Sequence, residues 1–225
     1  MDVICDKCQL ITSFISIMNP NRSLTPQEVS FIDRCVRLAY VKSGYLKTLD
    51  KADMPTLGTF RDVMRNETED VDEKMKQDLL ITLEMYVDGS AKYFNNQTNI
   101  EADNRLISYV IKDLSGVLKT QAMLLVMDNV WNRLSANRDK GVPTWIYIDE
   151  IHVLFRDPYC LQFIRDLYKR ARKYGGVLTG ITQNVEDCLK SDTARSMLSN
   201  SEFILMLNQA ASDRDQLSHL LKIPD

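Results

Sequence analysis

The residues best suited to chemistry in this sequence are two adjacent carboxylates, Asp149 and Glu150, which directly follow the apolar run Trp145–Ile148. A short run of aromatic and β-branched residues predicts a strand buried on both faces, as in a parallel sheet. Ionised carboxylates at the end of such a strand need a metal, a partner or water. Since open α/β sheets place their chemistry just beyond the carboxyl ends of the strands, we expect a functional site at this acidic pair.

An apolar strand that ends in Asp-Glu is the Walker B pattern of P-loop ATPases. There the first acid, here Asp149, holds Mg²⁺, usually through water, and the second, here Glu150, polarises the attacking water. The alternative is a strand end at the surface with two solvated acids, because acidic side chains are mostly exposed.

A second polar pair, Thr182-Gln183, ends another predicted strand, Val177–Thr182. An amide at the end of the strand beside a Walker B strand can bond the γ-phosphate or the attacking water. Gln183 equally suits the start of a helix at a loop, so both interpretations stay open.

Between these two pairs lies a basic segment that contains Lys169, Arg170, Arg172 and Lys173. Cations at the end of a helix are stabilised by the helix dipole, so a solvated helix end is one interpretation. Arg170 and Arg172 are two residues apart and therefore point in different directions, so that one could line its own subunit's site and the other a neighbour's. A nucleic-acid contact is the third interpretation, although the net charge of −3 gives no general affinity for nucleic acid.

The composition fits one α/β domain or an α/β core with a helical subdomain, since the chain has 225 residues, of which 44% are hydrophobic and 26% charged. No apolar run approaches the roughly 20 residues of a membrane span, and no signal peptide is visible. Five cysteines without a framework spacing indicate free thiols in a reducing compartment. The pair Cys5-x-x-Cys8 lacks a second pair of ligands, so buried thiols are favoured over a zinc site.

Residues 1–92 are predicted to form a helical subdomain or insertion. Thr25, Pro26 and Glu28 have the spacing of a helix start, with Thr25 as the N-cap. Apolar residues at helical spacing predict helices at residues 3–18, from 26 to a stop at Gly44, at 57–64 and at 71–87.

Residues 93–225 are predicted to form an α/β core. We expect strands at residues 106–111, 145–148, 177–182 and 203–207, and helices at 119–137, 159–174, 185–198 and 212–221. Strands that alternate with helices predict parallel βαβ units.

Several segments, in this order and spacing, resemble the VirB-type (TraE/TraC-like) ATPase family of conjugative type IV secretion systems, which is related to the HerA–FtsK motor ATPases. The segments are WIYIDEIHVLF, IRDLYKRARKYGG, VLTGITQNVEDCL and ARSMLSNSEFILMLNQ, and upstream LTPQEVSFIDRCVRLAY, PTLGTF and YVDGSAKYFNNQTNIEADNRLISYVIKDL. Nearly the whole chain is covered.

The resemblance implies a partial RecA-like P-loop ATPase core, with a parallel-rich sheet flanked by helices, beside a helical subdomain. It gives Asp149 the Mg²⁺ role, makes Glu150 the catalytic base and Gln183 the γ-phosphate sensor, and makes Arg170 and Arg172 candidates for contacts made in trans. ATP and Mg²⁺ are the implied cofactors of the full-length protein.

The resemblance also implies partners and a place in the cell. Family members resemble motors at the cytoplasmic side of the bacterial inner membrane that energise assembly of the transfer channel or pilus, or substrate transfer. They act as hexamers or dimers and dock on inner-membrane channel components.

The sequence departs from the family pattern in one respect, because it contains no Gly-x-x-x-x-Gly-Lys-[Ser/Thr] motif. That loop supplies the backbone N–H groups and the lysine that hold the phosphates, and in the family it lies upstream of the first helix here. We therefore expect part of a longer ATPase that is inactive alone and exposes apolar strand edges. The alternative is a non-catalytic protein-interaction module with a degenerate motor fold.

Overall fold

The computed structural model describes residues 3–19, 21–97, 104–111, 113–114, 116–156, 158–183 and 192–207. The chain divides into two compact units, Met1–Gln121 and Ala122–Asp225. The sequence predicts a boundary between a helical subdomain and an α/β core after residue 92, and this boundary stays a prediction. A long helix, α6 (Gly116–Asp139), runs from the first unit into the second.

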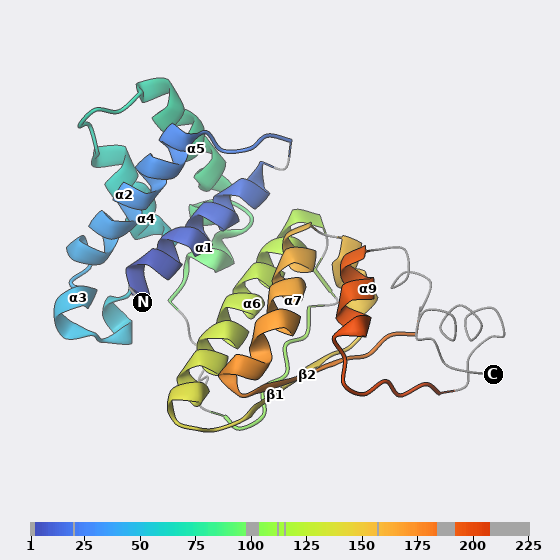
Figure 1. The fold of residues 1–225 in the computed structure, drawn as a ribbon. Helices are drawn as coiled ribbons and strands as arrows, with labels where there is room; N and C mark the ends of the chain where they lie inside the picture. The colour runs from blue at the N-terminus through green and yellow to red at the C-terminus, as the bar shows by residue number, and fades with distance from the viewer. Residues whose placement is uncertain are drawn as a thin grey trace. The chain divides into compact units, whose positions relative to one another are not determined.

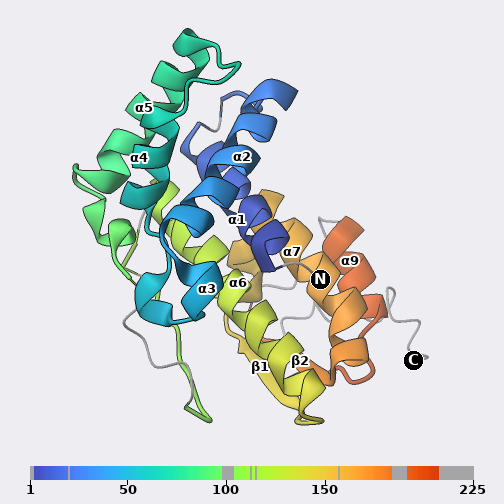
Figure 2. The same ribbon diagram turned by 90° about the vertical axis from the view of Figure 1, so that its left-hand side faces the viewer.

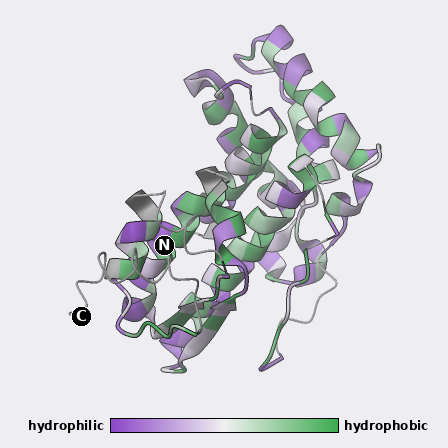
Figure 3. Cartoon of the chain, turned by 90° about the vertical axis from the view of Figure 1, so that its right-hand side faces the viewer, coloured by the Kyte–Doolittle hydropathy of each residue, from purple (hydrophilic) through white to green (hydrophobic). Residues whose placement is uncertain are grey.

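The first unit is helical, as predicted (Figures 1 and 2). Contacts join α1 to α2, α2 to α4 and α4 to α5. In Figure 3, hydrophobic and hydrophilic residues alternate along single helices, as expected where one face is buried. Its elements are α1 (Val3–Met18), α2 (Pro26–Lys42), α3 (Tyr45–Thr48), η1 (Lys51–Asp53), α4 (Leu57–Asn66), α5 (Glu73–Val87) and η2 (Lys92–Asn95).

The core of this unit is built from the apolar faces that the helical spacing predicts. Ile32 and Cys35 of α2 are fully buried, and they join Ile15 of α1, Met64 of α4 and Leu83 of α5 in one cluster. Burial of this kind stabilises each side chain by about 1.5–3 kcal/mol, so the helices hold one another in place.

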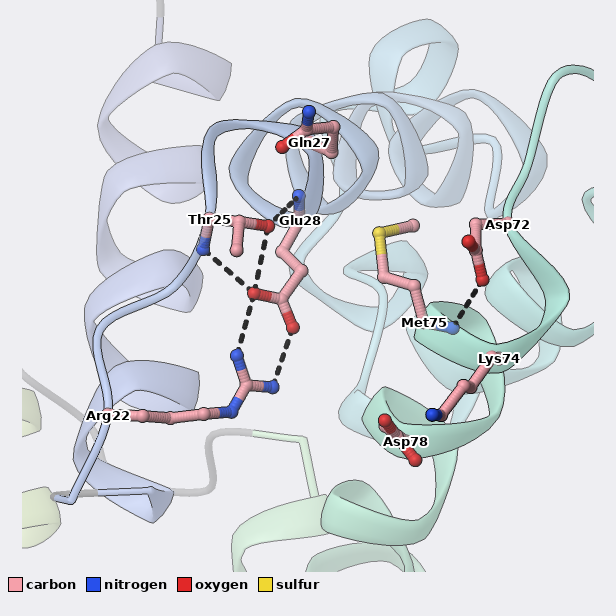
Figure 4. Close-up of a pocket in the computed structure, with 8 residues that line it drawn as sticks. All are labelled: Arg22, Thr25, Gln27, Glu28, Asp72, Lys74, Met75 and Asp78. Carbon is pink, nitrogen blue, oxygen red and sulfur yellow. Dashed lines mark hydrogen bonds and ion pairs between the residues drawn. The ribbon is translucent and has the colours of Figure 1, made fainter.

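The start of α2 is fixed by the predicted capping residues. The Thr25 hydroxyl accepts the Glu28 N–H at 3.3 Å, and the Glu28 carboxylate accepts the Thr25 N–H at 2.8 Å. Arg22 donates two further bonds to the two Glu28 oxygens, at 2.8 and 2.6 Å (Figure 4). This arrangement forms one wall of an open hollow of about 440 Å³ that is lined by Arg22, Thr25, Gln27, Glu28, Asp72, Lys74, Met75 and Asp78.

Glu28 is 3% exposed, so its charge depends on these partners. The Arg22 guanidinium lowers the pKa of the Glu28 carboxyl from 4.5 to about 2, and the Thr25 hydrogen bonds act in the same direction against the opposing effect of burial.

The second unit contains a parallel pair of strands, β1 (Thr144–Ile148) and β2 (Gly176–Gly180), in which Thr144 pairs with Gly176 and Ile148 with Gly180. Figure 1 shows α6 and α7 on one side of this pair, in agreement with a cluster of Leu134, Ile146 and Leu167. The remaining elements are η3 (Ile151–Arg156), α7 (Pro158–Arg170), η4 (Ala171–Tyr174) and α9 (Asp192–Ser199).

The expected burial of the first strand on both faces is wrong. Ile146 is 9% exposed, but Trp145 and Tyr147, which point to the other face, are 61% and 64% exposed. Successive side chains of a strand face opposite ways, and among the described residues helices cover only one face of the pair.

Two predicted strands are also not formed. Residues 106–111 and 203–207 are described without strand structure, and Leu106, Phe203 and Leu205 are at least 88% exposed. A β-branched or apolar segment becomes a strand only where it finds a neighbouring strand and a face to bury. The described part of the fold is therefore mostly helical with one two-stranded parallel sheet, which is less than the predicted parallel-rich sheet.

The other predicted elements of this half are found in part. The helix predicted at 159–174 is α7 followed by the 3-10 helix η4, and the one predicted at 119–137 is α6. Of the helix predicted at 185–198, residues 192–199 form α9, and residues 184–191 lie outside the described residues, as does the predicted helix 212–221.

As predicted, Cys5, Cys8, Cys35 and Cys160 form no disulfide. Of the pair predicted to be buried, Cys8 is buried and Cys5 is only partly buried, and Cys35 is buried as well. Burial raises the pKa of both Cys8 and Cys35 to about 12, so these thiols stay protonated. In the described part of the chain, no group of three or more histidine, cysteine or acidic side chains could hold a metal ion. None of the helices described there is long and apolar enough to cross a membrane.

We expect Arg22→Ala to lower the unfolding free energy of the helical unit by about 1–2 kcal/mol at neutral pH, because Glu28 loses a charge-assisted partner that is itself half exposed. The Glu28 pKa is depressed in the folded chain, so the stability is present above pH 4.5 and is lost as the pH falls towards 2. Urea unfolding followed by far-ultraviolet circular dichroism should show the difference between the two proteins narrowing over that range.

A matched control is Arg37→Ala, which removes an arginine that pairs with Asp33 at 2.8 Å on the exposed surface of α2. That change should lower the unfolding free energy by about 0.5 kcal/mol. Equal losses for the two variants would contradict the structural role assigned to Arg22.

Candidate functional site

The acidic pair Asp149-Glu150 forms a two-residue loop directly after β1. Two backbone hydrogen bonds to Ile181, the residue that follows β2, close this loop. The Ile181 N–H donates to the Ile148 carbonyl at 2.9 Å, and the Ile181 carbonyl accepts the Ile151 N–H at 3.0 Å. Both acids therefore stand opposite a single residue of the neighbouring chain segment, as in a β-bulge.

The backbone of Glu150 is in the left-handed region, with φ of +50°. This conformation costs a residue other than glycine on the order of 1 kcal/mol, and such strain collects at functional sites. The Glu150 N–H donates to Asp149 Oδ1 at 3.0 Å, which fixes the Asp149 carboxylate relative to the backbone of the loop.

Gln183 lies beside Glu150, as the parallel arrangement predicts. Its side-chain amide donates to Glu150 Oε1, although the two residues are 33 positions apart in the chain. The structure thus brings together Asp149, Glu150 and Gln183 beyond the carboxyl ends of β1 and β2. Two carboxylates and an amide at one rim can hold a hydrated cation and orient a water molecule.

His152 also belongs to this group, although it is not among the candidate residues that the sequence indicates. His152 Nδ1 lies 3.2 Å from Glu150 Oε2 and 3.0 Å from the Thr182 hydroxyl oxygen. The available signal was the spacing: His152 follows Glu150 by two residues, Thr182 precedes Gln183, and parallel pairing joins the two segments.

The structure does not bring the two candidate arginines to this rim. Arg170 ends α7 and Arg172 lies in η4, and both come just before β2 begins at Gly176. The acids lie beyond the opposite end of the strand pair. Five residues of strand span about 16 Å, so neither arginine is close to its own chain's acids.

The two arginines differ in their surroundings. The Arg170 guanidinium lies 4.9 Å from the centre of the Trp131 ring and 5.9 Å from that of Tyr174, and it donates to the Tyr174 hydroxyl at 3.3 Å. Arg172 is 89% exposed and pairs with Glu202 at 2.9 Å. Both arginines are thus exposed, Arg170 against two aromatic rings and Arg172 in an exposed ion pair.

A parallel strand pair that ends in Asp-Glu and a glutamine is the arrangement of a P-loop ATPase core. The family model of the TraG P-loop domain matches residues 28–225. The chain therefore belongs to the TraG P-loop domain family, which confirms the relationship inferred from the sequence segments.

Among solved structures, the chain is similar to VirB4 of Thermoanaerobacter pseudethanolicus, with a TM-score of 0.76 and 22% sequence identity. The match covers 98% of this chain and 61% of the VirB4 chain. It shows a shared fold, and the chain spans about three fifths of the length of that structure. No curated protein matches the sequence.

We expect Arg170→Ala to lower the stability of the second unit by about 0.5–1 kcal/mol, because an exposed cation loses its contacts with two aromatic rings. Arg172→Ala, the matched control, should change it by less than about 0.5 kcal/mol, since an exposed ion pair contributes little. Both tryptophans, Trp131 and Trp145, lie in this unit, so denaturation followed by tryptophan fluorescence measures the difference. A larger loss for Arg172→Ala would contradict this assignment.

Proposed function

We propose that this chain is the Walker B part of a type IV secretion ATPase, a motor that couples ATP hydrolysis to assembly of the transfer channel or pilus, or to substrate transfer. One observation carries the proposal: Glu150 and Gln183 meet beyond the carboxyl ends of two paired parallel strands. Membership of the TraG P-loop domain family and the VirB4-like fold support it.

The donor set fits Mg²⁺. One exposed carboxylate, that of Asp149, is anchored by the Glu150 N–H on one oxygen. Mg²⁺ keeps several waters and uses one or two carboxylates together with substrate phosphates, so a single acid of this kind is sufficient. When bound, the ion would neutralise charge on the phosphates.

The other two residues then act on the reacting water and the phosphate. Glu150 is the general base that orients and polarises the attacking water, and its left-handed backbone and fixed carboxylate suit that task. Gln183 is the proposed sensor of the γ-phosphate, since its amide donates to Glu150 Oε1 and can donate to a phosphate oxygen instead.

The phosphates also need a cradle of backbone N–H groups and a lysine, and the sequence contains no P-loop motif to provide them. The proposed activity therefore belongs to a longer protein in which another segment supplies that loop. We further propose that this protein forms hexamers or dimers and docks on channel components at the cytoplasmic side of the inner membrane.

In the P-loop-containing protein, we expect Glu150→Gln to lower kcat for Mg²⁺-dependent ATP hydrolysis by about 100-fold or more, because the amide cannot take a proton from water. Affinity for ATP should be unchanged. Glu84→Gln, an exposed carboxylate of α5, is the control and should keep full activity. Full activity in Glu150→Gln would remove the role of this residue, and a parent protein without any hydrolysis would favour a non-catalytic interaction module.

A mixing experiment tests Arg172 as the contact made in trans. Arg172→Ala and Glu150→Gln subunits should each be defective alone, and together they should recover part of the activity. The recovery arises where an intact Glu150 of one subunit faces an intact Arg172 of its neighbour. A mixture no more active than the separate variants would leave Arg172 as a solvated residue at a helix end.

A further inference from the structure

We propose that His152 and Thr182 are positioning residues that hold the Glu150 carboxylate for hydrolysis, an inference that rests on the proposed function. The His152 ring lies between Glu150 and Thr182, with Nδ1 3.2 Å from Glu150 Oε2 and 3.0 Å from Thr182 Oγ1. Its side chain is only 13% exposed, so the surrounding fold restricts its orientation.

Each oxygen of the Glu150 carboxylate has its own partner. Gln183 donates to Oε1, and His152 approaches Oε2. Thr182 directly precedes Gln183 in the segment after β2, and its hydroxyl contacts the His152 imidazole. The His152 ring is therefore linked to the segment that also carries Gln183. The four side chains therefore form a continuous chain of three contacts, from Gln183 through Glu150 and His152 to Thr182, and Thr182 and Gln183 are neighbours in the sequence.

The chemistry of the partners decides where the ring hydrogen lies. A carboxylate can only accept, so the contact with Glu150 is a hydrogen bond only when His152 carries a hydrogen on Nδ1. A lone pair on Nδ1 would face the negative Glu150 carboxylate at 3.2 Å, so the carboxylate favours a hydrogen on Nδ1. In that state the Thr182 hydroxyl oxygen, 3.0 Å away, accepts from Nδ1 and keeps the ring aligned.

A fixed carboxylate matters because orientation of the attacking water depends on it. A displacement of about 1 Å in a reacting group can cost on the order of 100-fold in rate. His152 contacts both Glu150 and Thr182, and Thr182 acts on Glu150 only through His152, so neither residue is assigned a contact with nucleotide. Their removal should therefore lower kcat and leave KM for ATP unchanged.

The kinetic test uses the P-loop-containing protein. We expect His152→Ala to lower kcat about 10-fold or more with KM within about twofold of wild type. His152→Asn, whose amide can replace Nδ1–H, should regain part of the loss. Thr182→Val should lower kcat by a smaller factor, and Thr182→Ser should restore it. Glu84→Gln, which changes an exposed side chain of α5, is again the control and should have no effect.

A second measurement does not need activity. In the 225-residue chain with labelled histidines, nitrogen NMR at mildly alkaline pH should show His152 with its hydrogen on Nδ1 rather than on Nε2. That signal should change in both Glu150→Gln and Thr182→Val. A hydrogen on Nε2, or a signal that neither variant alters, would overturn the inference.

The outcomes separate this inference from the proposed function. If Glu150→Gln abolishes hydrolysis and His152→Ala leaves kcat unchanged, the positioning role is wrong and the ATPase proposal stands. If His152→Ala weakens ATP binding and thermal stability as much as kcat, and His152→Asn rescues none of them, the residue is merely structural and the inference also fails. If Glu150→Gln retains full activity, the proposed function itself fails.

Discussion

The backbone ladder between β1 and β2 is the interaction on which the rest of the candidate site depends. The Ile181 N–H donates to the Ile148 carbonyl at 2.9 Å, and the Ile181 carbonyl accepts the Ile151 N–H at 3.0 Å. These two hydrogen bonds lie on either side of the acidic pair. The two residues between those bonds cannot continue the ladder, so they loop out. Loss of this pairing would release Asp149 and Glu150 from the segment that carries Gln183.

The strand pair is in turn held by the helices on its covered face. Leu134 of α6 and Leu167 of α7 pack with Ile146 of β1, and all three are nearly inaccessible. The approach of β2 is close: a side chain added at Gly176 would meet the Leu134 methyl at 2.8 Å. A site built from strand ends is only as rigid as this packing, because short two-stranded sheets are marginal without a helix layer.

The site also shows how polar contacts can restrict a strained residue. Glu150 adopts a left-handed backbone conformation that glycine would adopt at lower cost, and its carboxylate is nevertheless held by Gln183 and His152. The contacts offset the strain and select one orientation of the acid. Arg170 is fixed in a different manner, by the faces of Trp131 and Tyr174, at the far end of the same strand pair.

The sequence by itself determined the local features: the helices of the first unit, the capping of α2 by Thr25 and Glu28, and an acidic pair directly after a strand. These depend on near neighbours in the chain, and so spacing reveals them. Only the tertiary structure decided that residues 106–111 and 203–207 stay unpaired, that Trp145 is exposed, and that His152 joins the acids. A strand forms only beside a partner strand, and a strand face is buried only where another layer covers it. The hydrogen bond between Thr182 and His152, 30 residues apart, depends on the register of the two strands. None of these conditions is a property of a short segment.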